Sequence, residues 1–108
     1  MQAGAAAGVS LALPGHAGAG SYHDACGEVL CRKIPATGET IPVVGVGTNR
    51  FGPAGVDTVR DVLASMHELG GRVIDTAAMY GGSEEVIGQA LRDLGMQESM
   101  FVATKFNV

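Results

Sequence analysis

The sequence predicts an α/β fold in which short strands alternate with amphipathic helices. Three observations predict it: short apolar runs at residues 43–47, 72–76 and 100–105, apolar positions at helical spacing between them, and glycines where each helical pattern ends. Such an alternation implies a parallel sheet with right-handed crossovers. At 108 residues, 46% of them apolar and 17% charged, the chain is long enough for one modest core.

Residues 1–28 differ in composition from the rest of the chain. Residues 2–20 are mostly small or apolar, lack Lys and Arg, and contain Pro14 and many glycines, which disfavour a helix. The segment is too short to span a membrane, and its small residues Ala17 and Ala19 have the spacing that a signal peptidase accepts. It resembles the core of a twin-arginine export signal without the Arg-Arg pair.

We therefore expect residues 1–28 to be a truncated export signal and linker, with a flexible low-complexity tail as the alternative. An export signal would imply an exported or periplasmic protein, and its absence a cytoplasmic one.

Cys26 and Cys31 have a C-x4-C spacing. An oxidising compartment would permit a disulfide between them, and two unpaired small side chains in a linker are the alternative. The spacing matches no common zinc pattern, and the histidines His16, His23 and His67 are scattered, so we expect no metal site.

Residues 29–108 form the predicted folded part, which begins with a β-hairpin. Residues 32–42 place short apolar positions on both sides of "TGE", where Gly38 supplies the positive φ of a tight turn. The run "VVGVG" at residues 43–47 is typical of a strand buried on both faces, and we expect the same of "RVIDT" and "MFVATK".

The first predicted helix begins near Asp57 and ends at Gly70 and Gly71. Its apolar face consists of Val59, Leu63, Met66 and Leu69.

The second predicted helix has Ser83 as its N-cap, Glu84 and Glu85 in its first turn, and Gly95 just beyond its end. Its apolar face consists of Val86, Ile87, Ala90, Leu91 and Leu94.

The carboxyl ends of the predicted strands carry unusual residues. Gly47 and Thr48 follow the first strand, Asp75 ends the second and Lys105 ends the third. An open doubly wound sheet and a (β/α)8 barrel both bind ligands at this edge. The dinucleotide fingerprint of the doubly wound fold fails, because Arg50 replaces its third glycine and a loop precedes the helix.

Asp75, Tyr80 and Lys105 form a more specific set. A tyrosine hydroxyl, with a reference pKa of about 10, is a poor proton donor at neutral pH. A nearby ammonium makes it a better one, and a carboxylate pairs with the ammonium that would otherwise stand alone in a closed site. The set therefore predicts acid–base chemistry at this edge.

Three segments make residues 32–108 resemble the first third of an aldo-keto reductase: "IPVVGVGT", "VIDTAAMYGGSEEVIGQAL" and "FVATK". The resemblance implies a (β/α)8 barrel, of which this chain is the N-terminal part (hairpin plus β-α-β-α-β), with the hairpin plugging its bottom. It also implies reduction of aldehydes or ketones with NADPH, or less often NADH. The partner would be a small carbonyl substrate.

The resemblance also assigns roles to individual residues. Tyr80 would protonate the carbonyl oxygen, Lys105 would make its hydroxyl a better acid, and Asp75 would pair with Lys105. The cofactor-binding residues would be Gly47, Thr48, Asn49 and Asp75.

Two departures from the family pattern bear on activity. Arg50 follows Asn49 where many members have an aromatic residue in the substrate pocket. The family's catalytic histidine and its site for the adenosine 2′-phosphate lie beyond the counterpart of Val108, and His67 sits in a helix remote from the carboxyl edge. We therefore expect an incomplete barrel that is inactive alone.

The acidic, aromatic-poor composition of the chain bears on its partners. With a net charge of −4, 5% aromatic residues and no Trp, we expect no nucleic-acid partner, and we expect no membrane partner. A non-catalytic barrel and a stand-alone βαβαβ nucleotide-binding module are the alternative functions, and the oligomeric state stays open.

Overall fold

The computed structural model describes residues 27–106 of the chain. The predicted export segment up to residue 26, with Cys26, therefore lies outside the described residues. Cys31 is fully buried at the start of the first strand. Within residues 27–106, no helix has the length and apolar character needed to cross a membrane.

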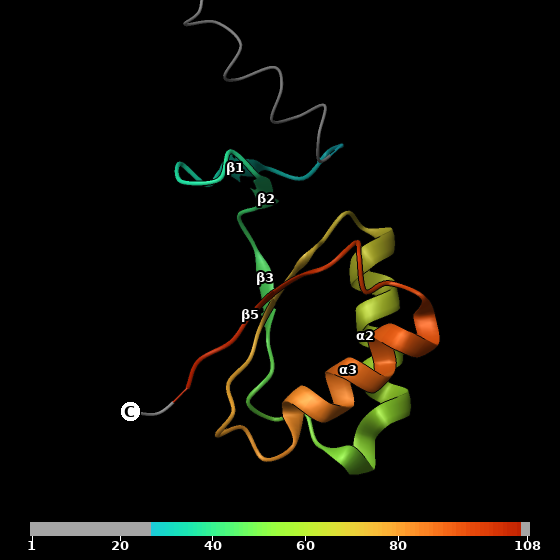
Figure 1. Ribbon diagram of the computed structural model, residues 1–108. Helices are drawn as coiled ribbons and strands as arrows, with labels where there is room; N and C mark the ends of the chain where they lie inside the picture. Colours follow the sequence, from blue (N-terminus) through green and yellow to red (C-terminus); the bar gives the residue numbers. More distant parts are fainter. Residues whose placement is uncertain (1–26, 107–108) are drawn as a thin grey trace, which may run out of the picture.

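A parallel sheet lies at the centre of the described part (Figure 1). It contains, in this order, β3 (Gly45–Gly47), β4 (Val73–Asp75) and β5 (Phe101–Ala103). Val46, Ile74 and Val102 lie level with one another across the strands. Because successive residues of a strand point to opposite faces, these three share one face and Asp75 points to the other.

Two helices cover the face on which Ile74 lies (Figure 1). They are α2 (Val56–Glu68), which follows the short 3-10 helix η1 (Pro53–Gly55), and α3 (Ser83–Leu94). The helices pack on each other and on the sheet around a buried core: Val59, Leu63, Ile74, Val86, Ile87, Ala90, Leu91 and Met100. This arrangement confirms the predicted β-α-β-α-β order.

The predicted hairpin is present at the amino ends of the parallel strands (Figure 1). Its strands β1 (Cys31–Lys33) and β2 (Thr40–Pro42) are antiparallel. Gly38 has a φ of +76°, and its amide donates to the carbonyl of Ile34 at 2.8 Å. Glycine is favoured at such a positive φ because it has no Cβ.

The strands are less buried than the sequence predicted. Val44, just before β3, is 70% exposed and Val102 in β5 is 44% exposed, whereas Ile74 in the middle strand is fully buried. The prediction of strands buried on both faces was wrong for the described residues. Here the helices cover only one face, and β3 and β5 each have a single neighbouring strand.

The end of α2 also differs from the prediction. Leu69, expected on the apolar face, is 78% exposed, because α2 ends at Glu68 and Leu69 is its C-cap. Gly70 then adopts a φ of +89°. A Cβ on Gly71 would lie 2.4 Å from Cγ of Met66, so the chain needs a glycine here to pass close to the helix.

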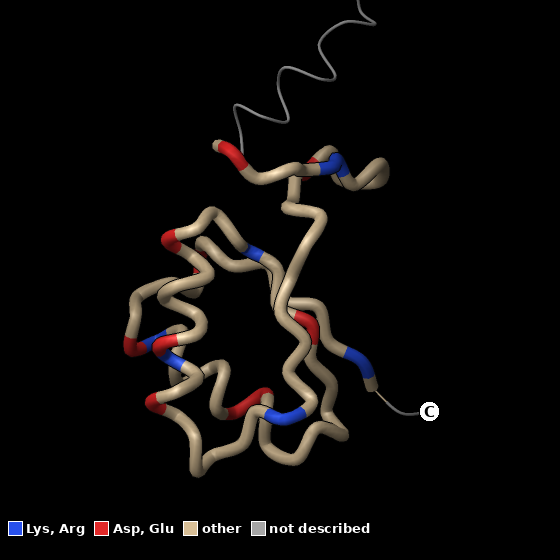
Figure 2. Tube along the Cα trace, turned by 180° about the vertical axis from the view of Figure 1, so that it is seen from behind, with Lys and Arg blue, Asp and Glu red and all other residues tan. Residues whose placement is uncertain are grey.

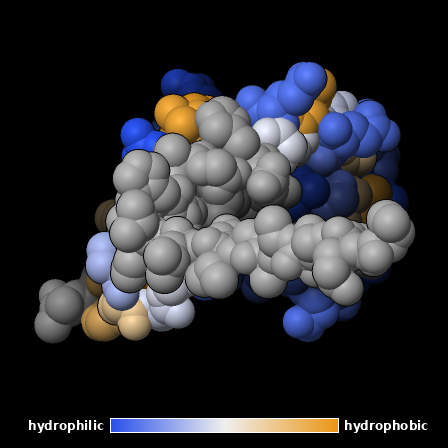
Figure 3. All heavy atoms as spheres, turned by 90° about the horizontal axis from the view of Figure 1, so that it is seen from above, coloured by the Kyte–Doolittle hydropathy of each residue, from blue (hydrophilic) through white to orange (hydrophobic). Residues whose placement is uncertain are grey.

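The surface of the described part carries charged side chains of both signs together with exposed apolar ones such as Leu69 and Phe106. Seen from above, the visible side chains of the described part are mostly hydrophilic, with several hydrophobic ones among them (Figure 3). Figure 2 shows the basic residues of the described part dispersed along the trace, with acidic residues between them.

Leu63 and Leu69 provide a matched test of this core. Leu63→Ala should lower the free energy of unfolding by about 2–5 kcal/mol, because it leaves a cavity at a fully buried position. Leu69→Ala should change it by less than about 0.5 kcal/mol, because Leu69 is exposed. Urea unfolding of both variants measures the difference, and equal losses would contradict the described packing.

Candidate active site

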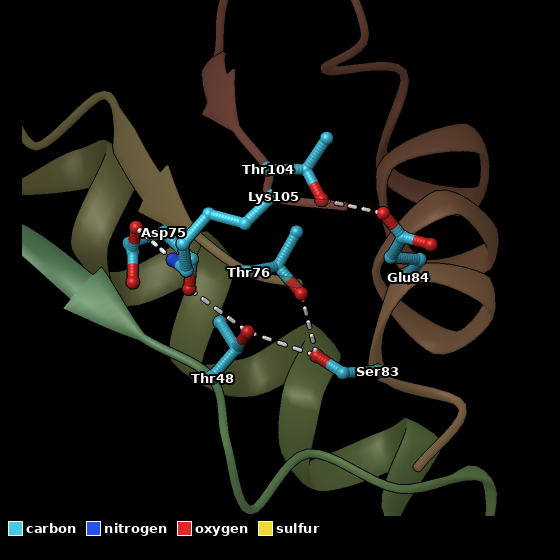
Figure 4. A network of polar contacts seen from close by, with 7 residues as sticks. All are labelled: Thr48, Asp75, Thr76, Ser83, Glu84, Thr104 and Lys105. Atoms are coloured by element: carbon cyan, nitrogen blue, oxygen red, sulfur yellow. Dashed lines mark hydrogen bonds and ion pairs between the residues drawn. The ribbon is translucent and has the colours of Figure 1, made fainter. Parts of the chain in front are cut away.

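Asp75 and Lys105 form an ion pair at the carboxyl edge of the sheet (Figure 4). Nζ of Lys105 lies 2.7 Å from Oδ1 of Asp75, and both side chains are about half exposed. Asp75 lies level with Ala103, and Lys105 comes two residues later, so both side chains leave the same face of the sheet. This face is opposite to the one that the helices cover.

The ion pair keeps Lys105 charged. The hydrogen bond to Asp75 raises the pKa of Lys105 above its ordinary value of 10.5; desolvation opposes the rise, and the charges of Asp75 and Tyr80 add to it. Because the pKa of Lys105 is higher in the folded state, the ion pair stabilises that state fully at pH values below the ordinary lysine pKa. This stabilisation is lost as the pH rises through the raised pKa. The ammonium is therefore present at neutral pH.

Tyr80 reaches the same ammonium from the loop after β4. Nζ of Lys105 lies 5.4 Å from the centroid of the Tyr80 ring, within the range of a cation–π contact. The loop turns tightly here, because the amide of Tyr80 donates to the carbonyl of Ala77 and Gly81 and Gly82 have positive φ angles. The structure thus brings together all three residues of the predicted catalytic set.

The predicted cofactor residues after β3 differ in accessibility. Gly47 and Asn49 are exposed, whereas Thr48 is fully buried. The amide and the hydroxyl of Thr48 both donate to the carbonyl of Asp75, at 3.1 Å and 2.9 Å. Thr48 therefore joins β3 to β4, and the cofactor roles of Gly47, Thr48, Asn49 and Asp75 stay predictions.

Ser83 does not cap α3 as predicted. The N-cap is Gly82, with a φ of +86° and no side-chain capping bond, and Ser83 is the first residue of the helix. The Ser83 side chain is buried, and its hydroxyl donates to Oγ1 of Thr48 at 2.8 Å. The prediction failed because the left-handed turn at Gly82 directs Ser83 toward the sheet.

The hydroxyls of Thr76, Ser83 and Thr48 form a buried chain (Figure 4). Oγ1 of Thr76 lies 3.0 Å from Oγ of Ser83. Since the single hydroxyl hydrogen of Ser83 is used in its hydrogen bond to Thr48, Thr76 is the donor in this contact. All three side chains are at most 1% exposed, and residues 27–106 contain no buried side-chain polar atom without a partner.

The sequence-based prediction missed this chain of hydroxyls. Thr76 directly follows the candidate Asp75, and Ser83 begins the helix. A signal for this chain is present in the sequence: a residue with a small hydroxyl side chain directly follows each parallel strand, and another begins the helix.

A further contact joins α3 to the end of β5. Oγ1 of Thr104 donates to Oε1 of Glu84 at 2.5 Å, on the helix side of the strand (Figure 4). Glu84 lies in the first turn of α3, next to Ser83.

His67 lies far from this site, as predicted. It is in the last turn of α2 and lines a hollow of about 670 Å³ at the amino ends of the strands, near the hairpin. Within residues 27–106, no cluster of three or more His, Cys, Asp or Glu side chains could hold a metal ion.

Ser83 provides a test of the buried chain of hydroxyls. Ser83→Ala should lower the free energy of unfolding by about 1–3 kcal/mol, because the buried hydroxyl of Thr76 loses its acceptor. Ser99→Ala is the control, since the Ser99 hydroxyl bonds a backbone carbonyl at an exposed position. Chemical denaturation measures both, and a Ser83→Ala variant as stable as the control would contradict the buried chain.

A family model and known relatives match the same region. Residues 43–108, more than half of the chain, match the model of the aldo/keto reductase family. An aldo-keto reductase of Mycobacterium sp. (strain MCS) is 40% identical over 72 residues, which make up 66% of this chain and 24% of the relative. The NADP(+) aldo-keto reductase yakc of Schizosaccharomyces pombe is 32% identical over 85 residues, 73% of this chain and 24% of that protein.

A solved structure supports the same assignment. A Pseudomonas aeruginosa protein assigned to the aldo-keto reductases is 36% identical, with a TM-score of 0.62 over 69% of this chain and 30% of that one. The described hairpin, strands and helices accordingly correspond to the N-terminal part of a (β/α)8 barrel. The chain spans about a quarter of the length of the curated relatives it matches. It belongs to the aldo/keto reductase family.

Proposed function

We propose that the protein to which this segment belongs reduces aldehydes or ketones to alcohols with NADPH, and that the segment supplies the proton donor. The observation that carries the proposal is the geometry at the carboxyl edge. Lys105 bonds Asp75 at 2.7 Å and lies 5.4 Å from the centroid of the Tyr80 ring.

Each of the three side chains has a role that its position supports. The Tyr80 hydroxyl gives its proton to the carbonyl oxygen of the substrate. The ammonium of Lys105 stabilises the phenolate that remains, as a positive charge close to an ionised group does. Asp75 holds Lys105 in place and keeps it protonated.

The residues at this edge fit a nicotinamide cofactor. Reduction of a carbonyl to an alcohol needs one proton and one hydride, and the described side chains offer a donor for the proton. The bound cofactor would supply the hydride. Gly47 and Asn49 are exposed beside Asp75 and would border it.

The names of two relatives favour NADPH over NADH in this proposal. Both the Schizosaccharomyces pombe relative and the glycerol 2-dehydrogenase of Saccharomyces cerevisiae carry NADP(+) in their names.

A non-catalytic use of the barrel is the alternative that Tyr80 can test. In the whole protein that carries this segment, Tyr80→Phe should lower kcat/KM for a reactive aldehyde by about 10²–10⁴-fold, because the general acid is lost. Steady-state NADPH oxidation measures the effect. Tyr22→Phe, a change of the chain's other tyrosine, is the control, and unchanged turnover in Tyr80→Phe would support the non-catalytic alternative.

We further propose that residues 1–108 alone do not turn over carbonyl substrates. The supporting observations are the half-exposed ion pair and the share of the relatives' length that the chain spans. An open site leaves the charges in water, where their effect on a reacting group is weak. The purified chain should therefore oxidise no NADPH in the presence of a reactive aldehyde, and oxidation that Tyr80→Phe abolishes would refute this.

A further inference from the structure

The first turn of α3 contacts both strand ends that carry the ion pair. Thr76 follows Asp75 and Thr104 precedes Lys105, and both threonines point to the helix side of the sheet (Figure 4). Because neighbouring residues of a strand point to opposite faces, fixing each threonine also fixes the direction of the charged side chain beside it.

Ser83 holds the end of β4. It accepts a hydrogen bond from Thr76 and donates one to Thr48, which in turn bonds the carbonyl of Asp75. The Asp75 backbone is thus linked to α3 through buried hydroxyls on the helix side. These hydrogen bonds involve the backbone carbonyl of Asp75 and not its carboxylate.

Glu84 holds the end of β5. Its carboxylate accepts a hydrogen bond from the hydroxyl of Thr104. Hydrogen bonds to ionised acceptors are stronger than those between neutral groups. The carbonyl of Lys105 also accepts a hydrogen bond from the amide of Ala78 at 3.1 Å. This bond connects the chain beyond β5 to the loop after β4.

We propose that Ser83 and Glu84 are positioning residues that hold the backbones of Asp75 and Lys105 at the separation their ion pair needs. An exposed ion pair loses much of its energy to the freedom of its long side chains, so it does not fix its own geometry. The catalytic meaning of this device rests on the proposed function, whereas its effect on the ion pair does not.

NMR titration of Lys105 tests the positioning without measuring turnover. The Asp75→Asn variant serves as the reference, because it gives the pKa of Lys105 without the ion pair. Thr104→Val removes the bond to Glu84 but keeps its charge, and Ser83→Ala breaks the link to β4. Both variants should move the pKa of Lys105 from its raised wild-type value toward that of Asp75→Asn.

Three further variants control this titration. Thr104→Ser should restore the wild-type titration, because it keeps the hydroxyl. Thr58→Val changes an exposed threonine of α2 and should have no effect. Thr76→Val replaces Ser83→Ala if that variant does not fold. A wild-type Lys105 titration in natively folded Thr104→Val and in the β4 variant would overturn the proposal.

Kinetics of the whole protein separate this proposal from the proposed function. If both hold, Thr104→Val should lower kcat about tenfold with little change in KM, because a small misplacement affects the reacting group more than binding. If the Lys105 titration shifts but the wild-type protein reduces no carbonyl, the positioning stands and the proposed function fails.

Discussion

The two-residue period of β4 governs the rest of the described structure. Ile74 is fully buried against the helices, so its neighbours Val73 and Asp75 must point to the opposite face of the sheet. Thr76 then returns to the helix side, where it meets Ser83. A slip of one residue would bury Asp75 in the core and expose Ile74, so the packing of the core and the place of the carboxylate are set together.

The loop after β4 depends on two glycines. Gly81 and Gly82 both have positive φ angles, and a Cβ on Gly82 would lie 3.1 Å from Cγ of Pro53 in η1. The turn therefore brings the start of α3 close to the segment that follows β3. This closeness explains how Ser83 reaches Thr48, which lies 35 residues earlier in the sequence.

The sequence predicted the elements because local periodicity determines them. The apolar spacing of α2 and α3 and the short apolar runs before Gly47 and Asp75 gave the correct order of helices and strands. The predicted burial of Leu69 and of Val102 was wrong. Both depend on what covers a position after folding: α2 ends before Leu69, and Val102 lies in β5, which has a single neighbouring strand.

The candidate site was predictable only in part, for a related reason. Asp75, Tyr80 and Lys105 lie at strand ends or in a short loop, and parallel strands bring such positions to one edge. The partners of Thr76 and Ser83 come from separate elements, so they depend on a register and a turn that no local pattern specifies.

The buried hydroxyls of Thr48, Ser83 and Thr76 order their protons in one direction. The carbonyl of Asp75 can only accept a hydrogen bond, so Thr48 must donate to it and each hydroxyl behind it must point the same way. Two hydroxyls alone can exchange donor and acceptor, but these three have no second arrangement that keeps all three hydrogen bonds. Their dipoles are therefore aligned toward the backbone of Asp75, a fixed polarisation that the fold itself creates.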